Sequence, residues 1–349
     1  MTLTTEIIKI DDVELDTKLA SAADVIKRGG LVVFPTETVY GLGGDATNPM
    51  SAEKIYSAKS RPSDNPLIIH IAQPEEAEEY TYTNSVYYDL ARAFMPGPIT
   101  VILRAKDNIP EKTRASLPSV AVRCPSNPIA RALISLAGVP IAAPSANLSG
   151  SPSPTTAAHV IDDMQGRVDV IIDGGDCEFG LESTIVKIED DSSLTLLRPG
   201  AITLEQLREV VPSVRLAPAV TDKLQEGERP LSPGMKYRHY APSAPVVLLD
   251  GEDSSCIEYI KQNLTEKIAL ICYSESISDY KGALPSIDVY DFGNSLDEKK
   301  QAHELFRILR DADKVGYDTI YAPLPKKQGI GLALYNRMIR AAAYTIKKL

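Results

Sequence analysis

The sequence lacks any hydrophobic run long enough to cross a membrane. Its longest apolar runs have the size of single strands, among them LVVFP, PLIIHIA and PVVLLD, whereas a spanning helix needs about 20 apolar residues. The N-terminus MTLTTEIIKIDD has no basic flank followed by an apolar core, so no signal peptide is predicted. We therefore expect a cytoplasmic protein with no membrane partner.

Cysteine is scarce and scattered. The sequence has four cysteines, at Cys124, Cys177, Cys256 and Cys272, with neither a CxxC pair nor the Cys/His spacing of a zinc site. This pattern predicts reduced thiols in a reducing compartment. No metal held by protein side chains is expected.

Clusters of positive charge are also missing. The formal net charge is −10, and no basic run is longer than KSR or KK. Tight binding to the phosphate backbone of tRNA or DNA usually requires a clustered basic surface, so we do not expect tight nucleic-acid binding. A small anionic ligand remains compatible with the sequence, because a few local cations are enough to bind it.

The common motifs for nucleotide binding and covalent catalysis are absent. There is no GxxxxGK[ST] phosphate loop, no GxGxxG after a predicted strand, and no GxSxG nucleophile motif. The sequence therefore does not favour a mechanism with a covalent enzyme intermediate.

What is present predicts two α/β domains, as expected for a chain of 349 residues. Residues 12–212 mix strand-like and helical segments with many direct strand-to-strand steps, which predicts a mixed sheet with flanking helices. Residues 213–245 are rich in proline and are interpreted as a linker. In residues 246–349, strand-like runs alternate with helical stretches at 253–263, 297–311 and 330–347, which predicts a smaller α/β/α Rossmann-like domain.

Local signals predict the ends of several elements. A helix is expected over residues 51–59 with Ser51 as its N-cap, and the stretch TETVYGLGGDA (residues 36–46) is interpreted as a loop. Thr203 and Gln206 have the spacing of a capping box at the start of another helix.

Polar side chains gather in loops at the predicted strand ends. Lys59 and Arg61 precede a proline-stiffened turn, Arg123 and Arg198 each end a strand, and His70 lies in the strand LIIHI. Ligands of α/β sheets bind at such loops, and arginine suits carboxylates and phosphates. Each residue also has a purely structural interpretation: the arginines as ion-pair partners, His70 as a core residue, and the serine-rich loop SANLSGSPSP as a flexible turn.

The order of these motifs resembles the YrdC family. PTETVYGLGG, KIYSAKSRPSDNPLIIH, MPGPITVIL, SVAVRCP, APSANLSGSPSPT, GLESTIV and LLRPG carry the resemblance over residues 12–212. The later stretches SPGMKYRHYAP and GIGLALYNRMIRAA resemble the linker and C-terminal domain of the long form of that family. The resemblance implies a YrdC-like twisted mixed sheet in the N-terminal domain.

The resemblance also implies the activity of the two-domain L-threonylcarbamoyladenylate synthases. Those enzymes are nucleotidyltransferases that form threonylcarbamoyl-AMP and pyrophosphate from L-threonine, bicarbonate or CO2, and ATP. A separate tRNA threonylcarbamoyl transferase complex then uses the product to modify an adenosine next to the anticodon. Mg²⁺ is expected to enter with ATP, held by the phosphates.

Particular residues receive roles through this resemblance. The L-threonine site would consist of Thr38, His70, Arg123, the backbone at Ala143, and Ser183. The ATP site would consist of Lys59, Arg61, Asn65, Ser119, Ser145, Asn147, Ser153, Arg198 and Tyr240. Lys59 and Arg61 are the expected catalytic residues, since they would neutralise the phosphates, and Tyr240 would close over the nucleotide as part of a linker lid. Ser119 stands where threonine is common in the family.

Three alternatives remain at this point. The same polar loops would suit an RNA- or ribosome-associated protein, although the acidic charge disfavours it. A carbamoyl-adenylate enzyme of the hydrogenase-maturation type is a second alternative, but its zinc-finger cysteine pattern is missing. The third is a separate ligand for the C-terminal domain at GIGLALYNRMIRAA.

Overall fold

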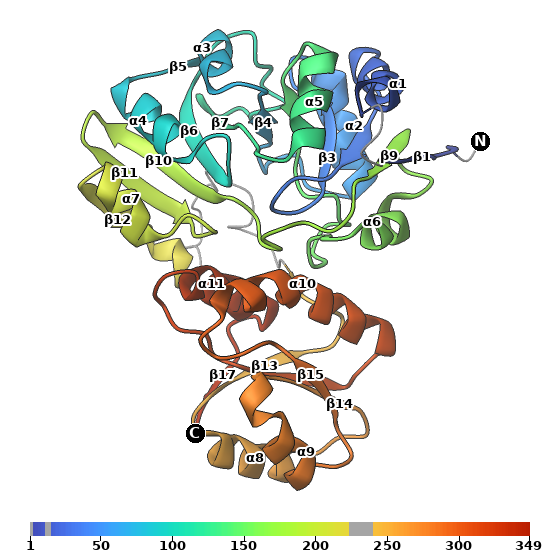
Figure 1. Cartoon of the computed structure of the whole chain (residues 1–349), viewed down its shortest axis with the longest axis vertical. Helices are drawn as coiled ribbons and strands as arrows, with labels where there is room; N and C mark the ends of the chain where they lie inside the picture. The colour runs from blue at the N-terminus through green and yellow to red at the C-terminus, as the bar shows by residue number, and fades with distance from the viewer. Residues whose placement is uncertain (1–2, 11–14, 223–239) are drawn as a thin grey trace. The chain divides into compact units, whose positions relative to one another are not determined.

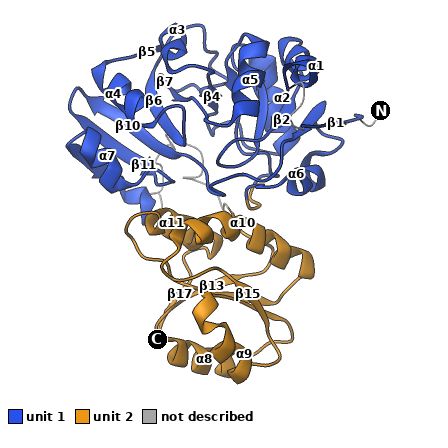
Figure 2. Cartoon of the chain, viewed as in Figure 1, with its two compact units in different colours: residues 1–149, 153–236 blue, residues 150–152, 237–349 orange. Residues whose placement is uncertain are grey.

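The computed structural model describes residues 3–10, 15–222 and 240–349. The chain divides into two compact units, each with its own sheet (Figure 2). The N-terminal unit contains residues 1–149 and 153–236, and the C-terminal unit contains residues 150–152 and 237–349. No helix within the described ranges is long and apolar enough to span a membrane.

The N-terminal unit is built on a twisted mixed sheet (Figure 1). In spatial order its strands are β1 (Glu6–Lys9), β9 (Val170–Asp173), β2 (Val32–Phe34), β3 (Gly41–Asp45), β8 (Ile141–Ala142), β4 (Ile68–His70), β7 (Ser119–Arg123), β6 (Ile99–Ala105), β10 (Thr184–Asp190), β11 (Ser193–Arg198) and β12 (Ser213–Leu216). The short strand β5 (Thr81–Tyr82) pairs with β6. Strand β7 is parallel to β4 and antiparallel to β6, so the predicted mixed sheet is confirmed.

Helices flank this sheet. They are α1 (Leu15–Lys27), α2 (Pro49–Lys59), α3 (Ala77–Tyr80), α4 (Ser85–Phe94), α5 (Pro128–Ala137), α6 (Ala157–Met164) and α7 (Leu204–Val210), with 3₁₀ turns at Pro74–Glu76 and Pro218–Val220. The capping box predicted at the start of α7 is confirmed, since the Thr203 and Gln206 side chains each accept from the other's backbone N–H.

Helix α2 begins earlier than its sequence pattern predicted. The N-cap is Asn48, whose side chain accepts a hydrogen bond from the backbone N–H of Met50, and Pro49 occupies the first turn. The prediction of Ser51 as the cap is therefore wrong. Asn48 is as good a cap as serine, and proline suits the first helical position because its missing N–H has no partner there anyway.

Side chains along the central strands point alternately to the two faces of the sheet. One core cluster holds Val33 of β2, Ile69 of β4, Val122 of β7, and Val101 of β6. Because successive side chains of a strand point to opposite faces, the residues next to these project from the other face of the sheet. On β4, β7 and β6 those neighbours are His70, Arg123 and Thr100.

The stretch predicted as a loop over residues 36–46 contains a strand instead. Residues 41–45 form β3, which is antiparallel to both β2 and β8. A Cβ atom on Gly43 would lie 2.7 Å from both Ile141 Cγ2 and Phe34 Cε1, so this position needs glycine. Glycine disfavours strands locally, and the close packing of the two neighbouring strands overrides that preference here.

The predicted linker begins with ordered structure. Strand β12 is parallel to β11, and the side chains of Val214 and Val220 are buried. The sheet therefore includes the first four residues of the predicted linker. Most of the predicted linker, residues 223–239, lies outside the described residues.

The C-terminal unit has a parallel sheet between two layers of helices (Figure 1). Its strand order is β15 (Asp288–Asp291), β14 (Ile268–Cys272), β16 (Thr319–Pro323), β13 (Val246–Asp250) and β17 (Ile346–Lys348). Helices α10 (Glu298–Val315) and α11 (Gly331–Ala341) cover one face, and α8 (Asp253–Gln262) and α9 (Ile277–Ala283) cover the other. The predicted Rossmann-like α/β/α layering is confirmed.

Two details of this unit differ from the sequence expectation. The helix predicted over residues 330–347 ends at Ala341, and residues 346–348 form β17 beside β13.

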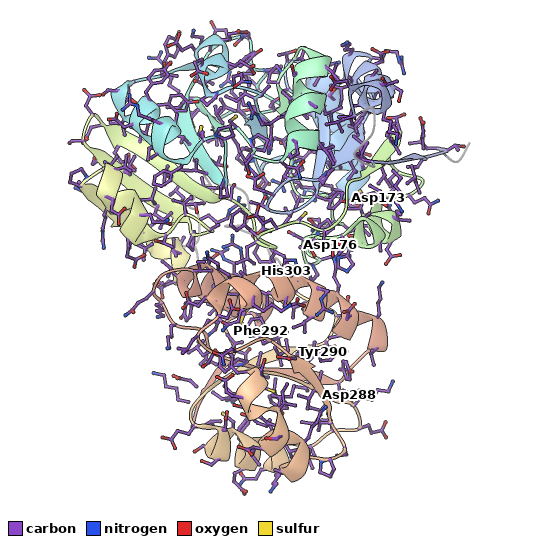
Figure 3. The ribbon with its side chains drawn as sticks, viewed as in Figure 1. Asp173, Asp176, Asp288, Tyr290, Phe292 and His303 are labelled. Atoms are coloured by element: carbon purple, nitrogen blue, oxygen red, sulfur yellow. The ribbon has the colours of Figure 1, made fainter. Side chains whose placement is uncertain are left out.

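Edge strand β15 carries Asp288 and Tyr290 (Figure 3). The hydroxyl of Tyr317 donates to Asp288 at 2.8 Å and lies 3.1 Å from the hydroxyl of Tyr290, which connects the edge strand to the segment after α10.

Candidate functional site

A buried ion pair lies at the end of β7. Arg123 Nη2 donates to Glu37 Oε1 at 2.8 Å, to Thr38 Oγ1 at 2.9 Å, and more weakly to Thr36 Oγ1 at 3.4 Å. The Arg123 and Glu37 side chains are only 5% and 3% exposed. Removing either partner would leave the other charge buried and unpaired, which is costly. The guanidinium is therefore held in one place.

His70 is the immediate neighbour of Arg123, because β4 pairs with β7 in parallel at these two residues. Its Nδ1 lies 3.2 Å from the carbonyl oxygen of Ile68 and 3.3 Å from that of Ile141. Carbonyl oxygens only accept, so Nδ1 carries the hydrogen and Nε2 is an acceptor. Burial, together with the nearby Arg123 charge, lowers the pKa of His70 to about 3. The ring is neutral at physiological pH.

Ser183 and Arg198 form a second group on the same sheet. The hydroxyls of Ser183 and Thr100 are 2.7 Å apart, and Arg198 donates to both the hydroxyl and the carbonyl of Ser183 at 3.1 and 3.0 Å. A Cβ on Gly200 would lie 2.5 Å from the backbone nitrogen of Thr184, so the chain after Arg198 packs directly on this turn. Ser183, a predicted ligand of threonine, and Arg198, a predicted ligand of the nucleotide, are thus in contact.

Lys59 connects the end of α2 to the serine-rich loop. Its Nζ donates to the backbone carbonyls of Ser145 and Asn147, the latter at 2.6 Å, and lies 3.3 Å from Asn147 Oδ1. Ser145 Oγ donates to Asn147 Oδ1 at 2.6 Å, and the N–H of Ser149 donates to the Lys59 carbonyl at 3.0 Å. The structure therefore brings Lys59, Ser145 and Asn147 together, and their predicted contact with ATP stays a prediction.

Arg61 organises the turn that follows α2. Its Nη2 donates to the carbonyls of Asn65 and Pro66, both at 3.2 Å, and the Arg61 and Asn65 side chains are buried. Asn65 Oδ1 is buried and has no hydrogen-bond partner among the described residues. The turn folds around its own arginine and keeps this amide oxygen available.

Ser119 lies at the opposite end of β7 from Arg123. It lines a groove of about 540 Å³ together with Ile102, Arg104, Leu117 and Lys187, among others. Arg104 and Lys187 were not among the residues predicted from the sequence. The alternation Thr100, Ile102, Arg104 along β6 was the available signal, since it places all three on one face.

Two carboxylates in the polar loops were also missed. Glu182 is buried and accepts a hydrogen bond from Ser153 Oγ at 2.5 Å, and Glu37 pairs with Arg123. Both lie inside motifs that had been singled out for their hydroxyls, TET and LEST. Ala143 lies beside β4, and its N–H donates to the Ile68 carbonyl at 2.9 Å.

Tyr240 belongs to the C-terminal unit. Its ring stacks on Phe306 with a centroid separation of 5.2 Å, and the Arg337 guanidinium lies 5.6 Å from the ring centroid. Its predicted contact with the nucleotide stays a prediction, and the rest of the predicted lid, MKYRH, lies outside the described residues.

Three residues of the serine-rich loop also belong to the C-terminal unit. The N–H of Ala241 donates to the Gly150 carbonyl at 3.1 Å, and Arg310 of α10 donates twice to the Pro152 carbonyl at 3.1 and 2.7 Å. The segment 150–152 is therefore anchored by defined hydrogen bonds rather than being only a flexible turn.

Acidic side chains do not form a metal cage in the described part of the chain. No group of three His, Cys, Asp or Glu side chains there is arranged to hold a metal ion. Asp173 ends β9 and Asp176 follows it (Figure 3), and Asp173 accepts from the backbone N–H of Gly175 at 3.2 Å. Lys59 has the hydroxyl of Ser145 and the amide of Asn147 close by, and Arg123 has two threonine hydroxyls beside its ion pair with Glu37. Cations accompanied by hydroxyls and amides suit small anionic ligands.

An α/β domain of this topology, with buried cations and hydroxyls at its strand ends, is typical of enzymes that bind small anions. Residues 24–200 match the Sua5/YciO/YrdC family described as telomere recombination. Residues 202–343 match the family described as threonylcarbamoyl-AMP synthase, C-terminal domain. The chain belongs to the two-domain threonylcarbamoyl-AMP synthase family.

Full-length relatives agree with this assignment. The chain is 39% identical to threonylcarbamoyl-AMP synthase of Pyrococcus abyssi, over 99% of this chain and 100% of that protein. It is 41% identical to the Bacillus subtilis protein of the same name, over 94% and 93% of the two chains. The crystal structure of P. abyssi Sua5 complexed with L-threonine superposes with a TM-score of 0.89, covering 99% of this chain and 100% of that one.

Proposed function

We propose that this protein forms threonylcarbamoyl-AMP and pyrophosphate from L-threonine, bicarbonate or CO2, and ATP. The observation that carries the proposal is full-length likeness to a protein solved with L-threonine, combined with a buried arginine whose guanidinium is fixed beside a neutral histidine. The reaction is adenylyl transfer, which makes the protein a nucleotidyltransferase.

The threonine would bind at the end of β7. Arg123 would hold its carboxylate, because a guanidinium offers paired donors to a planar anion. His70 Nε2 is an acceptor and would take a hydrogen bond from the threonine hydroxyl. Ser183, Thr38 and the backbone at Ala143 would complete the pocket.

The nucleotide would extend from the serine-rich loop toward the groove at Ser119. Lys59, Arg61 and Arg198 would neutralise the phosphates, so that an anionic carbamate can approach the α-phosphorus in line with the leaving pyrophosphate. The other expected nucleotide ligands are Asn65, Ser145, Asn147, Ser153 and Tyr240. A carbamate oxygen attacks phosphorus directly, and no covalent enzyme intermediate is needed.

Magnesium would arrive bound to ATP. The cations, hydroxyls and amides around Lys59 fit phosphate oxygens better than a bare metal ion, so the phosphates would be the main ligands of the metal. Bound there, Mg²⁺ would supply further neutralisation of the triphosphate charge.

The proposal extends to the cellular role of the product. Threonylcarbamoyl-AMP would pass to a tRNA threonylcarbamoyl transferase complex in the cytoplasm. The net charge of −10 argues against tight binding of the tRNA by this chain itself.

One assay tests the function directly. Purified protein is incubated with ATP, Mg²⁺, bicarbonate and L-threonine, pyrophosphate is measured, and the product is identified by mass spectrometry. Pyrophosphate that requires both threonine and bicarbonate, together with the mass of threonylcarbamoyl-AMP, supports the proposal. Release without threonine would favour the simpler carbamoyl-adenylate chemistry, and intact ATP together with salt-dependent RNA binding would favour the RNA-associated alternative.

A further inference from the structure

Glu37 is a buried carboxylate with one oxygen engaged and one oxygen without a partner. Oε1 accepts from Arg123 Nη2 at 2.8 Å, whereas Oε2 has no hydrogen-bond partner among the described residues. Arg123 shows the complementary feature, since its buried Nε–H also has no partner there. A buried polar atom without a hydrogen bond is unfavourable, so a ligand that satisfies both atoms would be strongly favoured.

The two atoms without partners are one acceptor and one donor, held on side chains 2.8 Å apart. An amino acid presents the matching pair, an ammonium that donates and a carboxylate that accepts, both attached to its α-carbon. The geometry points to Glu37 as the residue that binds the α-ammonium of L-threonine and accepts its proton before carboxylation. This inference rests on the proposed function, because it assigns a catalytic base to that reaction.

The chemistry requires such an acceptor. An ammonium nitrogen has no lone pair, so it must lose a proton before it can attack a carbon atom. Glu37 Oε2 takes that proton, and the nitrogen lone pair then forms the N–C bond to CO2 while one C–O π pair moves onto oxygen. The second N–H proton leaves to solvent, which gives the N-carboxylate and two released protons for each ammonium and CO2 consumed.

Other titratable groups around Glu37 are poor bases. Those near it are Arg123 on β7, Cys124 after that strand, and Cys177 on the loop after β9. Burial raises the pKa of Cys124 to about 12 and also raises the pKa of Cys177, so both thiols stay protonated. His70, beside Arg123, has its pKa lowered to about 3 and holds a proton only weakly.

The test compares E37Q with wild type across pH. General-base catalysis contributes about 10²–10⁴-fold, so E37Q is expected to lower kcat/KM for threonine at least 100-fold at pH 7. Because free α-amino groups titrate at about pH 8 and above, the E37Q rate relative to wild type should rise about tenfold per pH unit between pH 6.5 and 8. Glutamine keeps the size and a hydrogen-bond acceptor, so this rise isolates the lost base.

Glu182→Gln is the matched control, since Glu182 is a buried carboxylate bonded to Ser153 rather than to Arg123. Whatever its rate at pH 7, its pH profile should run parallel to that of wild type. A purely structural role of Glu37 would likewise give E37Q a loss that is constant across pH, and that result would overturn the inference. If wild type itself makes no threonylcarbamoyl-AMP, the proposed function fails instead.

A measurement on unmodified protein covers the case in which E37Q does not fold. Calorimetric titration with L-threonine at pH 7, in two buffers of different ionisation enthalpy, counts protons released on binding. An ammonium that binds opposite Glu37 releases none. Release of one proton per threonine would mean that the amine binds neutral without a protein acceptor, and would overturn the inference.

Discussion

At the scale of single residues, the Arg123 side chain makes several buried hydrogen bonds and is also the predicted ligand of threonine. Its Nη2 serves Glu37, Thr38 and Thr36, and the whole guanidinium is buried. Both charges are buried, so replacing one of them leaves the other without its ion-pair partner. Substitutions here therefore act on binding and on local stability together.

Arg123→Ala is expected to damage threonine use far more than ATP use. Truncating one partner of a buried charge pair costs about 2–5 kcal/mol, which corresponds to at least a tenfold rise in the KM for threonine. Steady-state kinetics with each substrate varied in turn measure the effect. Arg92→Ala is the control, because Arg92 forms an exposed pair with Asp89 and should change neither KM. Normal threonine dependence in Arg123→Ala would refute the role of Arg123.

His70 predicts a pH dependence of stability. Its pKa is about 3 in the folded protein and about 6.5 in the unfolded chain, so the unfolded state binds the extra proton between these values. The stabilisation by neutral His70 is complete above pH 6.5 and is lost as the pH falls toward 3.

His70→Asn removes the contribution of His70 to the pH dependence of stability. Between pH 6 and 4 the free energy of unfolding of the wild type should fall more steeply than that of the variant, by up to about 1.4 kcal/mol per pH unit for one proton. Urea unfolding at several pH values, followed by a probe of the N-terminal unit, measures the two slopes. Parallel slopes would contradict the neutral, buried state of His70.

At the scale of elements, close packing decides where β3 lies. A Cβ on Gly43 would lie too close to side chains of both neighbouring strands. Outside its own helix backbone, a Cβ on Gly282 in α9 would have no atom of the described residues within 4 Å. The same substitution should therefore have opposite effects at the two glycines.

Gly43→Ala is expected to destabilise the N-terminal unit by about 1–3 kcal/mol, since it overpacks the core between Phe34 and Ile141. Gly282→Ala is expected to stabilise the C-terminal unit by up to about 1 kcal/mol, because alanine loses less backbone entropy in a helix. Denaturant unfolding with a probe in each unit measures both changes. A stabilising Gly43→Ala would show that β2 and β8 separate more easily than the structure indicates.

Lys59 couples α2 to the serine-rich loop. Lys59→Met keeps the length of the side chain but removes the donors to Ser145 and Asn147. Amide exchange of residues 145–149 should become faster, and the KM for ATP should rise, while threonine binding changes little. Exchange that stays as slow as in wild type would mean that the loop is ordered without the lysine.

At the scale of the whole molecule, the N-terminal unit contains the first residues of the predicted linker. A deletion of residues 212–349 would remove β12, which pairs with β11, and Val220, which is buried. A chain that ends at residue 222 keeps both. The same cut removes Ala241 and Arg310, which hold the Gly150 and Pro152 carbonyls.

The chain 1–222 should therefore fold and bind threonine, but bind ATP less tightly and yield less product. The full-length variant Arg310→Ala should reproduce part of the loss, because it frees the loop between Asn147 and Ser153. Circular dichroism, calorimetric binding and the pyrophosphate assay measure these properties. Unchanged product yield and stability in the chain 1–222 would remove both the lid hypothesis and the proposed role of the loop anchor.

Much of the architecture was readable from local sequence. Apolar runs such as LVVFP and PVVLLD predicted buried strands, and Thr203 with Gln206 predicted a helix start, because both signals depend on residues close together in the chain. The ordered motifs from PTETVYGLGG to LLRPG predicted the family. In the structure Lys59 lies beside Ser145 and Asn147, and His70 lies beside Arg123, whereas the ligand roles given to these residues stay predictions.

What only the tertiary structure decided depends on contacts between distant segments. Glycine-rich β3 is a strand because β2 and β8 enclose it, and β17 forms because β13 offers an edge far away in sequence. Glu37 and Arg123 are 86 residues apart in sequence and form an ion pair in the fold. Folding also buries Glu37 Oε2 without a hydrogen-bond partner among the described residues. The sequence by itself determined the family and many of the elements, since these depend on local pattern and on the order of the motifs. Buried side chains, ion pairs and buried polar atoms without hydrogen bonds arise only when distant segments pack together. These features are the basis for proposing Glu37 as the base.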